Sequence, residues 1–413
     1  MTIKTRDRLN RSCYFMCPIF LNLLKIRYLI LISLFLSVVS GCQYQYYYQE
    51  GQFVRRDREG LKFSQDKTWE FFFKTTYFYP VRDWFDLRYQ WGRITGNHLP
   101  ARNLTETGDV ADSSFYTNRA IGGIDPSIIA RGPNLGPEPA GPYRIIKLKT
   151  SGGSSGFIGE DANGYKYLIK MDDSAYPELG STAEIIASRI YWALGYFVPE
   201  TYLITVGGTG DERFESKRAI ASRFVTGDIL GSYKYDWLRD RREFRALKLS
   251  AMWLNDVDRS DNNNLAAASD DFIRFYILDF NGALGSWQGR PKDSWQGYRY
   301  RWDVEKQLLL IVTLGIGRFC EAKPYPAIES NSLGYLRLEF DPQRWCGEKP
   351  NMAFDRMTDE DAAWMAGKIA LFSSEQLQVI ITQAKLSNPN DAQILLETLL
   401  ARREVILERY LKR

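Results

Sequence analysis

Carboxylate and carboxamide side chains are concentrated in residues 255–265, which read NDVDRSDNNNL. Another acidic residue, Asp279, ends the apolar run FYILD shortly afterwards. Side chains of this kind either cap the backbone of a solvated turn or supply oxygen ligands to a hard cation. A carboxylate base at Asp258, an amide at Asn263 and a second carboxylate at Asp279 are the types that phosphoryl transfer requires.

The histidine content excludes several other kinds of chemistry. The 413 residues include one histidine, His98, in the sequence GNHLP. Ser-His-Asp hydrolysis, HExxH zinc chemistry and two-histidine iron sites need histidines that this chain lacks. We interpret His98 as a loop residue, with a role as a single acid or base as the alternative. Any chemistry must therefore depend on Asp, Glu, Asn and Lys side chains.

Small and basic residues suited to phosphate binding precede the acidic segment. The turn SGGSSG at 151–156 lies between two predicted strands, where backbone N–H groups could hold phosphates. Lys170 ends the next strand, and Glu184 on the following helix could pair with it. The nucleotide-binding candidates are Gly152, Gly153, Ser154, Ser155, Gly156, Lys170 and Glu184.

Each candidate also has a purely structural explanation. SGGSSG could be a simple hairpin turn, Lys170 an exposed strand lysine, and Asp279 an Asx turn. Glu184 with Ser181 matches the S-x-x-E capping box. The residues nevertheless occur in the order that a kinase-like site requires, which favours the joint interpretation.

The elements that must position these side chains follow from hydrophobic periodicity. Alternation predicts strands at 143–150, 157–161, 165–172, 201–208, 217–225 and 271–280. Helices are predicted from Ser181 to about Gly195 and at 242–256, 359–372, 374–386 and 391–411. We therefore predict an α+β, bilobal, protein-kinase-like fold: an N-lobe antiparallel sheet with one helix, a helical C-lobe, and an irregular N-terminal extension.

The first residues form a predicted export signal. Basic residues precede the apolar run at 28–40, which is too short to span a bilayer comfortably. The run ends in Val39-Ser40-Gly41-Cys42, which looks like a bacterial lipobox. We expect removal of 1–41 and a diacylglyceryl (palmitate-type) lipid anchor on Cys42. An uncleaved membrane helix is the alternative, and Met16 could be the true start.

The expected location is therefore the bacterial cell envelope, facing the periplasm or exterior, with the membrane as a partner. Gln43, rather than Asp, follows the anchor and favours the outer membrane in a two-membrane cell. Export favours disulfides, so Cys320 and Cys346 form a candidate pair. A net charge of +4 gives no reason to expect nucleic-acid binding. The predicted domains are a signal peptide at 1–41, a tether at 42–65, an extension at 66–142, the N-lobe at 143–228 and the C-lobe at 229–413.

Four segments carry a family resemblance: residues 156–172, 183–200, 253–265 and 276–286. They resemble a family of bacterial secreted proteins and lipoproteins, largely uncharacterised, with an atypical kinase fold. More distantly they are similar to HipA-type, phosphatidylinositol and CotH-like kinases and to secretory-pathway casein kinases. In those relatives D-R-x-x-x-N stands where typical protein kinases have H-R-D-x-x-x-x-N. The resemblance covers roughly residues 145–412.

The resemblance implies a role for each matching residue. Asp258 matches the catalytic base, Asn263 and Asp279 the cation ligands, Lys170 the phosphate-binding lysine and Glu184 its partner. ATP with Mg²⁺ or Mn²⁺ is the implied cofactor, and the implied activity is phosphate transfer to an unknown envelope protein, lipid or sugar.

Three departures from the family pattern leave alternatives open. The loop lacks a clean G-x-G-x-x-G, Asn281 occupies the place of the usual Gly, and Asn262 or Asn264 could replace Asn263. An inactive, pseudokinase-like lipoprotein that acts as a binding or scaffold module is therefore the second hypothesis. A structural envelope protein whose 25 Tyr and 11 Trp bind polysaccharide is the third.

Overall fold

The computed structural model describes residues 53–55, 63, 73, 77–150, 153–269, 271–301, 307, 330, 332–337 and 340–412. The described residues divide into two compact units, one that contains 81–97 and another that contains the described residues of 53–80 and 98–412. The chain passes between them within helix α3 (Tyr79–Trp84). The smaller unit contains α4 (Leu87–Thr95), whose first turn is capped by Asp86. All the candidate site residues that the structure describes belong to the larger unit.

A five-stranded antiparallel sheet forms the first part of the kinase-like region, with strand order β2-β3-β4-β6-β5. Its strands are β2 (Arg144–Leu148), β3 (Gly156–Glu160), β4 (Lys166–Met171), β5 (Thr201–Thr205) and β6 (Arg218–Arg223). Each overlaps a segment that was predicted as a strand, and β3 begins one residue earlier than predicted, at Gly156. One face is apolar, because alternate side chains project to the same side, and Phe157, Tyr167 and Ile169 are fully buried there.

Helix α6 (Leu179–Ala193) packs against this sheet and is enclosed on every side. Fourteen of its 15 residues are buried, as expected of a helix that is apolar around its circumference. It begins two residues before Ser181, so the capping box with Glu184 does not form. Ser181 instead donates through its N–H (2.7 Å) and its hydroxyl (2.6 Å) to Asp172.

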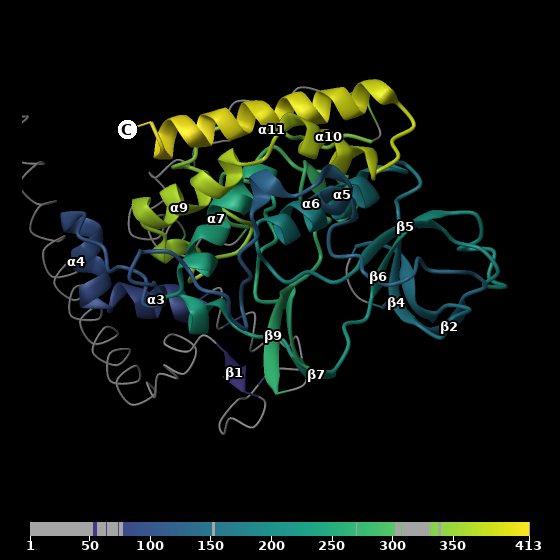
Figure 1. The fold of residues 1–413 in the computed structure, drawn as a ribbon, viewed down its shortest axis with the longest axis horizontal. Helices are drawn as coiled ribbons and strands as arrows, with labels where there is room; N and C mark the ends of the chain where they lie inside the picture. Colours follow the sequence, from purple (N-terminus) through teal and green to yellow (C-terminus); the bar gives the residue numbers. More distant parts are fainter. Residues whose placement is uncertain are drawn as a thin grey trace, which may run out of the picture. The chain divides into compact units, whose positions relative to one another are not determined.

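A second antiparallel sheet has the order β1-β9-β8-β7. Its strands are β1 (Val54–Arg55), β7 (Asp228–Gly231), β8 (Asn264–Ser269) and β9 (Phe272–Ile277), and Figure 1 shows β1, β9 and β7 beside one another. Only β9 was predicted as a strand. The acidic loop connects α7 (Arg242–Leu254) to β8, and a short pair follows, β10 (Ser286–Trp287) with β11 (Arg290–Pro291).

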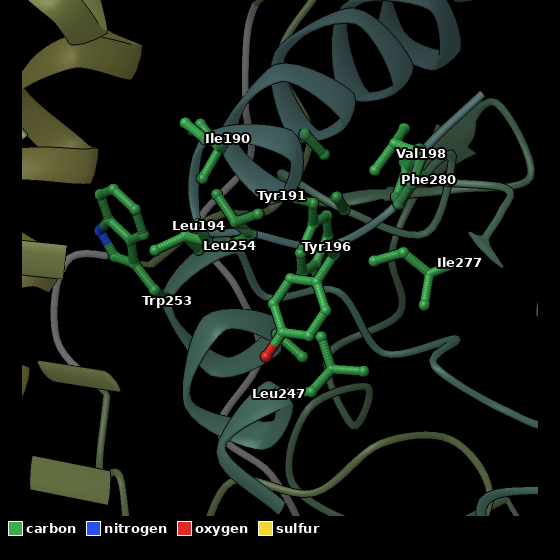
Figure 2. Close-up of a cluster of buried hydrophobic side chains, with 14 of the residues drawn as sticks. Ile190, Tyr191, Leu194, Tyr196, Val198, Leu247, Trp253, Leu254, Ile277 and Phe280 are labelled. Atoms are coloured by element: carbon green, nitrogen blue, oxygen red, sulfur yellow. The ribbon is translucent and has the colours of Figure 1, made fainter. Parts of the chain in front are cut away.

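The remaining helices form the second part of this region. They are α5 (Pro126–Arg131), α9 (Asp359–Ala370), α10 (Ser374–Thr382) and α11 (Pro389–Tyr410), with one-turn 3₁₀ helices at Ile121–Gly123, Tyr235–Leu238 and Phe354–Arg356. Figure 1 shows α11 running along α9 and α10. Side chains from α6, α7 and β9 meet in one buried cluster, shown in Figure 2, which includes Ile190, Tyr191, Leu247, Trp253, Leu254, Ile277 and Phe280.

A β-rich region with one enclosed helix, followed by a helix-rich region, confirms the predicted α+β class and the predicted order of these two regions. Within the described residues, no helix combines the length and the apolar character needed to cross a membrane. The expected signal peptide and Cys42 lie outside the described residues. Val54 and Arg55 fall in the predicted tether, yet they pair with β9.

Candidate active site

Lys170 lies near the end of β4, and its side chain is buried at 7% exposure. Its ammonium group forms an ion pair with Glu184 on α6 and lies 3.2 Å from Asp279 Oδ1. Burial alone would lower the pKa of Lys170, but the carboxylates of Asp279 and Glu184 raise it above its ordinary value. The sheet, helix α6 and the segment after β9 therefore meet at one permanently charged ammonium group.

Glu184 connects the same three elements from the helix side. One of its carboxylate oxygens contacts Lys170, and the other accepts a hydrogen bond of 3.2 Å from the backbone N–H of Phe280. Burial raises the pKa of Glu184, and the Lys170 ammonium opposes that rise. Because Phe280 stacks on Tyr191 of the same helix at 5.2 Å, the residue after Asp279 is fixed to α6 by its backbone and by its ring.

Asp279 adopts a left-handed backbone conformation, with φ of 56°, which Asp tolerates better than most residues. The side chain of Asp279 is 40% exposed, whereas that of Lys170 is buried. Burial raises the pKa of Asp279, but Lys170 and then Arg259 lower it, to about 2. The result is a partly exposed carboxylate that is ionised at every physiological pH.

The buried side chain of Arg259 fixes the position of the acidic loop. It forms a buried ion pair with Asp256 at 2.8 Å and donates to the backbone carbonyl of Asp279. Asp256 also accepts a hydrogen bond of 3.0 Å from the hydroxyl of Tyr191. Asn351 fixes the carbonyl of Arg259 at 2.8 Å. The arginine of the D-R-x-x-x-N pattern thus joins the loop before β8 to the segment after β9.

Asp258 lies where these two segments touch. Its neighbour Val257 donates to the carbonyl of Gly282 at 3.2 Å. A Cβ atom at Gly282 would lie 3.0 Å from the Cβ of Asp258, which leaves no room for a larger residue. Burial raises the pKa of Asp258 above 3.8, against the opposing effect of Lys349. A raised pKa makes a carboxylate a better proton acceptor near neutral pH.

The three consecutive asparagines differ in what their side chains do. Asn263 donates through its amide nitrogen to the carbonyl of Asp258 at 2.8 Å. This hydrogen bond does not use the side-chain oxygen of Asn263, which lies on the same loop as Asp258. Asn264 is occupied at both ends by the backbone of Tyr233, at 2.8 and 2.9 Å. The side-chain oxygen of Asn262 is buried. Of the three alternatives, the geometry favours Asn263 as a cation ligand.

A divalent cation fits the donor set of this site. Among the described residues, no three His, Cys, Asp or Glu side chains gather as a metal cluster. Mg²⁺ does not require such a cluster, because it usually keeps one or two protein oxygen ligands and takes the others from water and substrate phosphates. The carboxylate of Asp279 and the amide oxygen of Asn263 are hard oxygen donors of this kind.

The small-residue loop is described from Gly153 onward; Gly152 lies outside the described residues. Gly156 must be glycine, because a Cβ atom there would lie 2.1 Å from the carbonyl oxygen of Ile169. The carbonyl of Ser155 accepts a hydrogen bond of 2.9 Å from Met171, so the loop end is held against β4. Ser154 accepts from Lys149, at 2.6 Å through its carbonyl and at 3.2 Å through its hydroxyl.

Sequence reasoning missed three basic residues at this site. Arg259 could have been found, because it belongs to the D-R-x-x-x-N pattern. Lys149 could have been found from its place at the end of the strand before the loop. Lys292, which donates to the backbone carbonyls of Asn255 and Gly282 (2.7 Å for Gly282), gave no signal because it follows an irregular Gly-rich segment.

Two further candidates from the sequence are His98 and the Cys320–Cys346 pair. His98 lies in an exposed loop, as interpreted from the sequence. Cys346 is half-buried, but Cys320 lies outside the described residues, so their pairing stays a prediction.

Comparison with known proteins adds two distant likenesses. No protein-family model matches the sequence, and neither does any curated protein. Among solved structures the chain is similar to the proinflammatory kinase CtkA of Helicobacter pylori, with a TM-score of 0.36 and 17% identity over 62% of this chain and 94% of that one. It is also similar to the MAP kinase LmaMPK10 from Leishmania major, with a TM-score of 0.21 and 11% identity over 66% and 82%. At these scores the likenesses add nothing to the geometry described above.

Proposed function

We propose that the chain is an ATP-dependent phosphotransferase that uses Mg²⁺ or Mn²⁺. One observation carries this proposal: the Lys170 ammonium group is fixed by Glu184 and lies 3.2 Å from Asp279. A charged lysine between a buried carboxylate and a partly exposed one is the arrangement that positions nucleotide phosphates and their cation in kinase-like sites.

Each residue has a chemical task in this proposal. Asp258 accepts the proton of the acceptor hydroxyl, and its raised pKa suits it to that role. Lys170 and the N–H groups of the 151–156 loop hold the phosphates, while Asp279 and Asn263 hold the cation. The cation, when bound, neutralises charge on the transferred phosphoryl group. Arg259 and Glu184 position these groups without touching the substrate.

The lipid anchor on Cys42 places this activity at the bacterial envelope, facing the periplasm or exterior. This part of the proposal is supported by the basic leader, the apolar run at 28–40 and the lipobox-like sequence. The acceptor is then an envelope protein, lipid or sugar rather than a nucleic acid, in keeping with the small net charge of +4.

A second candidate function is that of a nucleotide-binding or scaffold lipoprotein without transfer activity. The irregular loop and Asn281 in place of Gly favour it. It uses the same fold and the same group of residues as the first proposal but transfers no phosphate.

Nucleotide binding and phosphate transfer by the full-length chain, purified in detergent, separate these functions. We expect calorimetry to show ATP binding that requires Mg²⁺ or Mn²⁺, and radiolabelled ATP to transfer phosphate to an envelope extract. Asp279→Ala should abolish transfer. The matched control is Asp271→Ala, which removes an exposed carboxylate at the β8–β9 turn and should leave transfer unchanged.

The outcomes are distinct. A wild-type chain that binds no nucleotide would overturn the phosphotransferase and leave only a scaffold that needs no nucleotide. Nucleotide binding without transfer by the wild type would establish the scaffold function and overturn the phosphotransferase. Transfer that persists in Asp279→Ala would overturn the role assigned to this carboxylate.

A further inference from the structure

Three residues lie in one row across the first three strands of the five-stranded sheet. Leu148 pairs with Phe157, and the next N–H along β2, that of Lys149, donates to the carbonyl of Gly156 at 2.9 Å. Gly156 in turn pairs with Lys170 on β4. Residues directly opposite each other in an antiparallel sheet project to the same face. Lys149 and Lys170 therefore flank Gly156 on one face.

The middle of this row carries no side chain and cannot carry one, because a Cβ atom at Gly156 would also lie 3.2 Å from the Cα of Lys170. Neighbouring strands are spaced by about 4.8 Å, so the Cα atoms of the two lysines are separated by roughly 10 Å. The side chains of Lys149 and Lys170 thus leave the same face of the sheet on either side of a residue without a side chain, at the root of the small-residue loop. Two ammonium groups on one face can both donate to the oxygens of a polyphosphate chain.

The two lysines differ in how their charge is balanced. Lys170 has two carboxylate partners, Glu184 and Asp279. Lys149 is half-buried and donates to the carbonyl and hydroxyl of Ser154 instead, and no carboxylate among the described residues forms an ion pair with it. Burial and the Lys170 ammonium lower the pKa of Lys149, while Asp279 raises it. Lys149 therefore interacts electrostatically with both Lys170 and Asp279.

We propose that Lys149 is a second phosphate ligand, which with Lys170 clamps the phosphate tail of a nucleoside di- or triphosphate over Gly156. This inference rests on the proposed nucleotide binding and deepens it. On binding, the Lys149 ammonium exchanges the carbonyl of Ser154 for phosphate oxygens, which form stronger, charge-assisted hydrogen bonds. The clamp also explains how the loop can hold phosphates without a G-x-G-x-x-G sequence: a cation at the root of the loop replaces part of the backbone N–H cradle.

Three variants of the full-length chain test the clamp. Lys149→Met removes the ammonium group and keeps most of the aliphatic chain, whereas Lys149→Arg keeps the charge. Lys147→Met is the matched control, because Lys147 is exposed on the same strand two residues earlier. Calorimetry should compare ATP with adenosine, which has no phosphates, in the presence of Mg²⁺.

We expect Lys149→Met to weaken ATP binding by about 10–100-fold, the effect of losing a hydrogen bond between charged groups. Adenosine affinity should stay within about twofold of wild type, and Lys149→Arg should recover most of the ATP affinity. Lys147→Met should bind ATP like the wild type.

Three results would overturn the clamp. The first is equal ATP affinity in Lys149→Met and Lys147→Met while the wild type binds ATP, which leaves the proposed function standing. The second is an equal loss of ATP and adenosine affinity with a lower unfolding temperature, which would assign Lys149 a purely structural role. The third is a wild-type chain without nucleotide affinity, which would remove the proposed function and the clamp together.

Discussion

The two sides of the candidate site differ in their exposure to solvent. On the sheet side, the side chains of Lys170 and Glu184 keep 7% and 3% of their exposure. On the loop side, Asp279 keeps 40%, and Asp258 is half-buried. A buried ion pair is costly to disturb, whereas a partly exposed carboxylate remains available to a ligand. In the proposed function, the sheet side therefore fixes the geometry and the loop side supplies the groups that react.

The largest expected effect lies on the loop side. Asp258→Asn removes the proton acceptor and should lower the phosphate-transfer rate by about 10²–10⁴-fold. The free energy of unfolding should change little, since Asp258 is only half-buried. Transfer kinetics and urea denaturation of the variant measure the two effects. An unchanged transfer rate would break the proposed division of roles, and so would a large loss of stability.

The pH dependence of the transfer rate of the wild type also tests the role of Asp258. Asp258 must be deprotonated to accept a proton, and burial raises its pKa above 3.8. The transfer rate should therefore fall as the pH is lowered through this raised pKa. Asp279, with its pKa lowered to about 2, stays ionised over that range. A pH–rate profile whose acid limb is unchanged in Asp258→Asn would contradict the assignment.

On the sheet side, the expected effect is a loss of stability. Glu184→Gln removes one partner of a buried ion pair and should lower the free energy of unfolding by about 3–5 kcal/mol. Glu160→Gln is the control, because Glu160 pairs with Arg144 at 2.8 Å where the arginine side chain is 68% exposed. Loss of an exposed pair should cost less than about 1 kcal/mol. Equal costs in the two variants, measured by chemical denaturation, would remove the distinction between the two sides.

A smaller effect is expected at Asn263, which supports the loop and is the proposed cation ligand. Asn263→Ala removes the hydrogen bond to the carbonyl of Asp258 and an oxygen donor. The Mg²⁺ concentration for half-maximal transfer should rise by about 10–100-fold, the range for losing a supporting contact at a metal site. Asn262→Ala, titrated in parallel, shows whether the assignment within the asparagine run is right. A larger shift in that variant would move the role to Asn262.

An effect on the pH dependence of stability is expected at Lys292, which is buried between the two loops. Burial lowers its pKa from 10.5 to about 7. The unfolded chain therefore binds more protons between these two values, and stability rises with pH in that interval by at most about 1.4 kcal/mol per pH unit. Lys292→Met should remove this contribution. Equal slopes for wild type and variant, in denaturation series between pH about 7 and 10, would contradict it.

The elements with strong periodicity were predictable from the sequence. The strands around Lys170 are short apolar segments bounded by turn residues, and the last helices have apolar helical periodicity. The structure adds capping boxes at Thr358 and Ser373, which were not predicted. β8 was missed because its sequence, Asn-Leu-Ala-Ala-Ala-Ser, has little strand propensity and depends on pairing with β9. Pairing between distant segments cannot be inferred from local pattern, and β1 was missed for the same reason.

The residue types of the candidate site were predictable from the sequence, but their distances and contacts were not. The order of Lys170, Glu184, Asp258 and Asp279 could be found in the sequence, and the structure brings Lys170, Glu184 and Asp279 into contact. The pairing of Lys149 with Gly156 depends on strand register, and the burial of Arg259 on the packing of segments far apart along the chain. Neither the strand register nor the burial of Arg259 can be inferred from residues adjacent in the sequence.

The enclosure of α6 limits how the protein can be switched on and off. A helix with solvent on one flank can rotate or swing outward and carry its glutamate away from the lysine. Helix α6 has protein around nearly its whole circumference, and Arg218 ties its first turn, through Ser181 at 2.8 Å, to the backbone at the end of α10. Outward rotation of α6 would expose apolar side chains that are now packed against neighbouring residues. In the proposed phosphotransferase, any control over turnover then acts on the surface segments or on substrate access rather than on this helix.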